Sequence, residues 1–291
     1  MIGWLMGMGN VRLALATQVL MNVLNIILDL VFVLGLGLGV SGVAYATLIA
    51  EISAVLFGAW LILRANRVKI AQIKLPMLIE SEPLIKMLKV NRDLFLRTVC
   101  LLTMTVIFTS KGASMGEVTL AANAILLQIH YIMAYLLGGF ANASGIIVGR
   151  AIGGRNPSLY KRAFSLSAHW GFIAAILLFL FILLFGGNIV AVFTTITEVK
   201  EEAIELLIWM MVFPIVGFWG LQLDGIFSGA TEAKSIRDSM ILALIVFLLV
   251  IWLCVPNYHN HGVWLAFVLF SLSRSVFLSL FIPKLTRTKF K

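Results

Sequence analysis

Eight long apolar segments restrict what this sequence can fold into. Each is long enough to cross the hydrocarbon core of a bilayer, which takes about 20 predominantly apolar residues in a helix. The segments are residues 13–35, 40–63, 94–113, 119–148, 163–186, 203–230, 237–256 and 262–283. Their apolar runs are continuous, whereas the strands of a membrane barrel alternate in short pieces. The pattern therefore predicts an all-α, polytopic membrane protein with about eight transmembrane helices.

The composition supports a membrane protein. Only 12% of the residues are charged and 61% are hydrophobic, whereas an ordinary soluble domain carries about 25% charged residues. The mean hydropathy is +1.05, so a water-soluble fold could not bury enough of this surface. The net charge of +9 would also be typical of a nucleic-acid-binding protein, and its distribution along the chain decides between the two.

The basic residues gather in alternate connections between the predicted spans. The connections after the second, fourth and sixth spans and the C-terminal tail hold Arg64, Arg67, Lys69, Lys74, Lys86, Lys89, Arg92, Arg150, Arg155, Lys161, Arg162, Lys234, Arg237, Lys284, Arg287, Lys289 and Lys291. The opposite connections offer only Lys111 and Lys200. By the positive-inside rule the basic connections and both termini are cytoplasmic. We therefore predict membrane lipids rather than nucleic acid as partners, and a lipid-headgroup contact by the basic linker stays an alternative.

A weak internal repeat suggests how the chain is divided. Residues 42–46 (GVAYA) can be laid over residues 262–266 (GVWLA) at an offset of 262 − 42 = 220. Repeated halves of the same orientation are a known transporter plan. We predict the last two helices of an incomplete N-terminal lobe at 1–64, a cytoplasmic basic linker at 65–92 and a six-helix C-terminal lobe at 93–291. A first copy of equal length would begin roughly 130 residues upstream, so about four helices are expected to be lacking.

A few ionisable residues lie inside the predicted spans, where they are costly and often functional. Asn25 and Asp29 are spaced i, i+4, which places both side chains on one helix face. An amide beside a carboxylate can hold a proton or a small cation, although a helix-packing hydrogen bond is the alternative. Asp224, Arg274 and Arg97 are further intramembrane polar candidates, each of which needs a partner or a wet cavity.

Enzyme chemistry has little support in the sequence. The four histidines, His130, His169, His259 and His261, do not have the H-E-x-x-H metal spacing. Neither a nucleophile–base set nor a Gly-rich phosphate loop is visible. We therefore expect no catalytic residues, no metal and no ATP-driven transport.

Short motifs along the whole chain resemble one transporter family. They are 3–7 (GWLMG), 24–29 (LNIILD), 44–51 (AYATLIAE), 91–97 (NRDLFLR), 120–126 (LAANAIL), 223–227 (LDGIF) and 260–266 (NHGVWLA). Together they are similar to the multidrug and toxic compound extrusion (MATE) family, in its DNA-damage-inducible protein F-like branch. The chain departs from that branch at Gly138 and Gly145, where acidic residues are usual.

The resemblance implies a fold of two six-helix lobes and a secondary antiporter of the bacterial inner membrane. Such proteins export small amphipathic, often cationic, organic compounds in exchange for protons or sodium, and need no cofactor beyond the coupling ion. Their N-terminal coupling site joins a first-helix carboxylate to residues that match Asn25, Asp29 and Thr47 here. A non-transporting membrane remnant or interaction protein built on the same helices is the alternative. The substrate, the coupling ion and the oligomeric state are not predicted.

Overall fold

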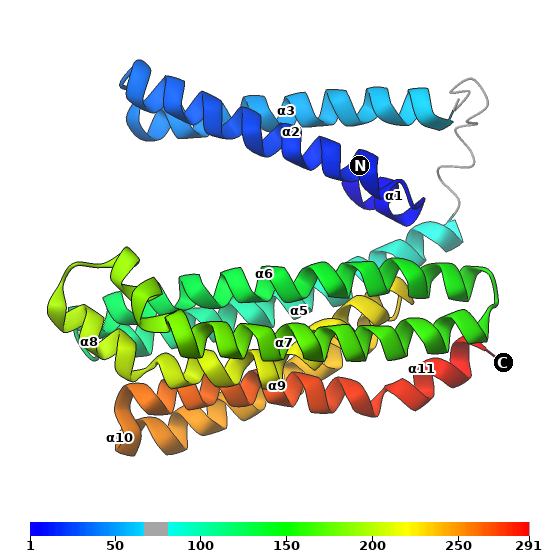
Figure 1. Ribbon diagram of the computed structural model, residues 1–291. Helices are drawn as coiled ribbons and strands as arrows, with labels where there is room; N and C mark the ends of the chain where they lie inside the picture. Colours follow the sequence, from blue (N-terminus) through cyan, green and yellow to red (C-terminus); the bar gives the residue numbers. More distant parts are fainter. Residues whose placement is uncertain (67–80, 291) are drawn as a thin grey trace. The chain divides into compact units, whose positions relative to one another are not determined.

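The computed structural model describes residues 1–66 and 81–290, and within them it contains helices and no strand, which confirms the all-α prediction (Figure 1). The elements are α1 (Ile2–Gly7), α2 (Val11–Asp29), the π-helix η1 (Leu30–Gly35), α3 (Gly39–Asn66), α5 (Ser81–Ala113), α6 (Glu117–Gly153), α7 (Pro157–Phe193), α8 (Thr197–Glu205), α9 (Leu207–Gly229), α10 (Ala233–Leu280) and α11 (Ile282–Lys289).

Seven segments of the described chain are long and apolar enough to cross a membrane. The last of them, Ala233–Lys289, has 57 residues and contains two of the predicted spans. The backbone of His259 takes φ 46° and ψ −124°, which breaks α10 into two helices. The chain folds back there so closely that a Cβ on Gly262 would lie 2.8 Å from the carbonyl oxygen of Cys254. Each of the eight predicted spans therefore has a helical counterpart.

The chain forms two compact units, Met1–Ser81 and Glu82–Lys291. Helix α5 begins at Ser81, so residues 81–92, predicted as linker, are helical. The predicted lobe boundaries themselves stay a prediction. Four basic residues of the linker and tail, Arg67, Lys69, Lys74 and Lys291, lie outside the described residues.

In the first unit, α2 and α3 pack against each other and are joined through η1. A Cβ on Gly42, near the start of α3, would lie 3.2 Å from the backbone carbon of Phe32 in η1. Gly262 meets the backbone of the preceding helix in the same way in the second unit. The repeated glycine thus allows close backbone packing at the turn of both helical hairpins, which supports the internal repeat.

The second unit is built around α9, which packs against α6, α7 and α10. The backbones of helices α6 and α9 are in direct contact. A Cβ on Gly225 would lie 2.1 Å from the carbonyl oxygen of Ala141, and a Cβ on Gly229 would lie 2.1 Å from the carbonyl oxygen of Gly145. Small residues permit this approach between membrane helices. A Cβ on Gly145 would itself lie 2.6 Å from the Gly225 carbonyl oxygen. The close contact between α6 and α9 therefore leaves no room for an acidic side chain at position 145.

Candidate functional site

Helices α2 and α3 bring two of the three predicted coupling residues into contact. The Asn25 Nδ2 group donates to the Thr47 hydroxyl across 3.4 Å. That hydroxyl in turn donates to the Val43 carbonyl oxygen one turn earlier, at 2.9 Å. The amide nitrogen of Asn25 is thus directed at Thr47, which leaves its side-chain oxygen available to other groups.

Asp29, the third predicted coupling residue, is the last residue of α2 and directly precedes the π-helical turn η1. Single π-helical turns occur frequently at functional sites. The Oδ1 atom of Asp29 is buried and has no hydrogen-bond partner among the described residues. A buried carboxylate oxygen without a donor is an acceptor available for a proton or a cation. The coupling role of Asn25, Asp29 and Thr47 stays a prediction.

The three other polar candidates meet in the second unit. Asp224 of α9 accepts through Oδ2 from Arg97 of α5, at 3.2 Å, and the same oxygen accepts from Arg274 of α10. The side chains of Arg274 and Asp224 are 12% and 13% exposed, and that of Arg97 is 31% exposed. Two guanidinium groups and one carboxylate leave this arginine cluster with one excess positive charge.

The arginine cluster retains donors that it does not use. The Nε atoms of Arg97 and Arg274 are buried and lack a hydrogen-bond partner within residues 1–66 and 81–290. The acid nearest along α5, Asp93, is already paired with Arg237 at 2.7 Å and with Arg92 at 2.9 Å. The excess charge of the cluster is therefore not balanced by Asp93.

Buried amide contacts in the second unit were not predicted. Ser167 donates to Gln222 Oε1 at 2.9 Å, and Gln222 Nε2 donates to the Leu137 carbonyl oxygen at 3.0 Å, which ties α9 to α7 and α6. Asn123 and Asn260 exchange two hydrogen bonds, of 3.0 and 3.1 Å. The sequence does contain a signal for such contacts. The amide side chains of Asn123 and Gln222 each stand in an apolar run, and an amide in the membrane needs a hydrogen-bond partner.

A cavity of about 170 Å³ lies among α5, α6 and the second half of α10. Half of its wall is aromatic and the rest is mostly aliphatic, with polar groups from Thr105, His130 and Tyr131. The His130 ring packs edge-on against Phe267, with the ring centroids 4.7 Å apart. Its Nδ1 atom is buried and has no hydrogen-bond partner in the described part of the chain.

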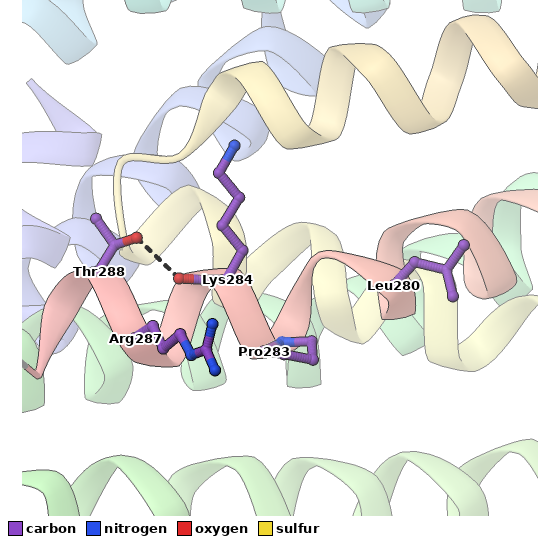
Figure 2. A pocket seen from close by; sticks show the side chains of 5 residues that line it. All are labelled: Leu280, Pro283, Lys284, Arg287 and Thr288. Atoms are coloured by element: carbon purple, nitrogen blue, oxygen red, sulfur yellow. Dashed lines mark hydrogen bonds between the residues drawn. The ribbon is translucent and has the colours of Figure 1, made fainter.

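Two of the wider hollows in the described chain lie near the ends of helices. One, of about 500 Å³, is lined by glutamates of α8 and by residues 258–261, and His261 pairs there with Glu205 at 3.1 Å. The other, of about 530 Å³, lies along α11 (Figure 2). Its cations Lys284 and Arg287 point apart and do not converge on one ligand position. Within the described ranges, no group of three or more His, Cys, Asp or Glu residues could hold a metal ion.

A family model and two curated proteins that are similar to this chain point to the same family. The MatE family model matches residues 94–256. The chain is 34% identical over 279 residues to DNA damage-inducible protein F of Escherichia coli K12, covering 96% of this chain and 61% of that protein. It is 25% identical to the chloroplastic Protein DETOXIFICATION 44 of Arabidopsis thaliana, covering 88% of this chain and 48% of that protein.

Solved structures give the same fold. An outward-facing multidrug resistance MATE family transporter of the MOP superfamily matches with a TM-score of 0.87 and 25% identity, over 98% of this chain and 66% of that one. A MOP superfamily transporter from Pyrococcus furiosus, described as having a binding pocket of reverse polarity, matches with a TM-score of 0.84 and 24% identity, over 96% and 63%. The present chain thus spans less than two thirds of the two curated relatives.

Proposed function

Because this chain belongs to the MatE family, whose members are transporters and not enzymes, we propose that it acts in a secondary antiporter. The proposed antiporter exports small amphipathic or cationic organic compounds in exchange for protons or sodium ions. It resides in the bacterial inner membrane with both chain ends in the cytoplasm, as the distribution of Lys and Arg favours.

The observation that carries the antiport proposal is the buried Asp29 oxygen without a donor among the described residues. Asn25 lies one helical turn away on the same face and is hydrogen-bonded to Thr47. A proton would bind directly to the carboxylate. A sodium ion would be held by the carboxylate, the Asn25 side-chain oxygen and the Thr47 hydroxyl, since hard cations prefer oxygen ligands.

Coupling then requires that the bound cation favours one transporter conformation over the other. A ligand shifts a conformational equilibrium only by its difference in affinity for the two states. Cation binding at Asp29 would cancel its negative charge in the membrane, and would stabilise the state in which the carboxylate is enclosed. Rocking of repeated halves about a fixed site is the movement that such folds use.

The proposal is tested with the chain reconstituted in liposomes, by following efflux of a fluorescent organic cation under an imposed pH or sodium gradient. Asp29→Asn should abolish the gradient-driven component. Glu117→Gln, a matched change at an exposed residue in the first turn of α6, should leave it unchanged. Full gradient-driven efflux in Asp29→Asn would overturn the role of Asp29. A folded wild-type chain without efflux under either gradient would favour the non-transporting alternative.

A further inference from the structure

The aromatic cavity of the second unit is large enough for one small ring. Its volume is about 170 Å³, and its wall includes Phe108, His130, Tyr131 and Phe267. A dry apolar cavity of about 150 Å³ in another protein takes up benzene. Edge-to-face contacts already order these rings, with Phe108 and Phe267 at 5.5 Å between centroids, so an aromatic guest would find favourable partners.

The arginine cluster draws both of its arginines from two of the helices that line this cavity, α5 and α10. On α5, Arg97 precedes the cavity residue Leu101 by one turn, or about 6 Å along the axis. On α10, Arg274 follows the cavity residue Phe267 by two turns on the same face. An elongated ligand with its ring in the cavity would therefore extend its other end toward the two guanidinium groups.

The excess positive charge of the arginine cluster favours a negatively charged group at the other end of the ligand. Asp224 neutralises only one of the two arginines, and Asp93 is bound to Arg92 and Arg237. The buried Nε groups of Arg97 and Arg274 still lack acceptors in the described chain. An unmatched cation in a membrane span is costly, and guanidinium groups match carboxylates in geometry.

We propose that the second unit binds a small aromatic carboxylate, with the ring in the cavity and the carboxylate on Arg97 and Arg274. A ligand with an ammonium group would be repelled by the excess positive charge, and a neutral amide would leave that charge unmatched. An anionic lipid headgroup offers similar chemistry, but its long acyl chains do not fit a ring-sized cavity. The proposal goes beyond antiport and does not depend on it, because binding needs no ion gradient.

The test is equilibrium dialysis of the purified chain in neutral detergent against labelled 3-phenylpropionate, in which a two-carbon linker joins the ring to the carboxylate. The comparators are 3-phenylpropanamide and 3-phenylpropylamine, which keep the ring and change only the head group. We expect the carboxylate to bind at least about tenfold more tightly than either, as one charge-assisted pair provides. An amine that binds as tightly as the carboxylate would overturn the proposal.

Variants separate the head-group contact from the cavity contact. Arg97→Gln leaves the Arg274–Asp224 pair and should weaken carboxylate binding about tenfold, whereas Arg97→Lys keeps the charge but loses the planar guanidinium group and should weaken binding less than Arg97→Gln. Thr105→Phe fills the cavity and should weaken binding without any change of charge. Arg162→Gln, at an exposed residue of α7, is the control. Unchanged binding in both Arg97→Gln and Thr105→Phe would place the ligand elsewhere.

A further measurement in the same dialysis experiment distinguishes a small carboxylate from an anionic lipid headgroup as the ligand of the arginine cluster. Phosphatidylglycerol and phosphatidylcholine are each added to the dialysis at the same concentration. A small-carboxylate site predicts that neither lipid displaces 3-phenylpropionate. Competitive displacement by phosphatidylglycerol alone would assign the arginine cluster to lipid headgroups and contradict the proposal.

Discussion

The two units differ in the partners that they provide to an aspartate within a membrane span. In the first unit, the buried Oδ1 of Asp29 has no hydrogen-bond partner among the described residues. In the second unit, one oxygen of Asp224 binds two arginines from two other helices. The first carboxylate is available to a cation, whereas the second holds helices together and is outnumbered by positive charge. The same residue type in similar apolar surroundings thus supports different chemistry, and the partners decide which.

The largest expected effect follows from removing each carboxylate charge. Asp224→Asn leaves two guanidinium groups without a counter-charge and should lower stability by about 3–5 kcal/mol, as breaking a buried ion pair does. Asp29→Asn removes a charge that has no partner in the described chain and should change stability by less than about 1 kcal/mol. Thermal unfolding of both variants in detergent checks this. Equal losses would show that Asp29 is as firmly paired as Asp224.

The next effect concerns the close α6–α9 contact of the second unit. Gly225→Ala places a Cβ only 2.1 Å from the Ala141 carbonyl oxygen, so the two backbones must separate at a cost of about 1–3 kcal/mol or more. Gly138→Ala is the matched control, because its Cβ would meet nothing within 4 Å and Ala favours a helix. Comparison of the two melting temperatures tests the contact, and a tolerated Gly225→Ala would refute it.

A smaller effect is expected from the buried amide of the second unit. Gln222→Leu removes the bonds to Ser167 and to the Leu137 carbonyl oxygen and should cost about 1–3 kcal/mol, the usual penalty for unpaired buried polar groups. Denaturant titration in mixed micelles measures this loss. If Gln222→Leu is neutral, the ties from α9 to α6 and α7 contribute nothing beyond packing.

The smallest effect on stability belongs to the first unit. The Asn25–Thr47 hydrogen bond is long, at 3.4 Å, and Thr47 is exposed within the described structure. Asn25→Ala should therefore change stability by about 0.5 kcal/mol or less. The same variant should reduce any stabilisation by sodium, which thermal melts with and without the ion would detect. A large loss of stability without any change in ion response would make Asn25 a structural residue.

The sequence predicted the helices well because apolar runs of this length have few other solutions in a membrane. It did not predict the meeting of Arg97, Asp224 and Arg274, because these residues are 127 and 50 positions apart and depend on how three helices pack. The helical start at Ser81 was also missed, since residues 81–92 are too polar for a span.

The site was predicted unevenly for the same reason. Spacing within α2 placed Asn25 and Asp29 on one face, but only the structure shows the π-helical turn after Asp29 and the hydrogen bond from Asn25 to Thr47. Sequence spacing was used only to argue against a metal-binding role for His130. Its position in the wall of an aromatic cavity depends on contacts between distant helices, which a local pattern does not contain.

We propose that the first unit provides a cation site at Asp29 and that the second unit does not. The decisive measurement is the sodium and proton dependence of the melting temperature, compared among the wild-type chain, Asp29→Asn and Arg97→Gln. We predict that the cation response of the wild type persists in Arg97→Gln and disappears in Asp29→Asn. A full response in Asp29→Asn, or its loss in Arg97→Gln alone, would contradict a cation site at Asp29.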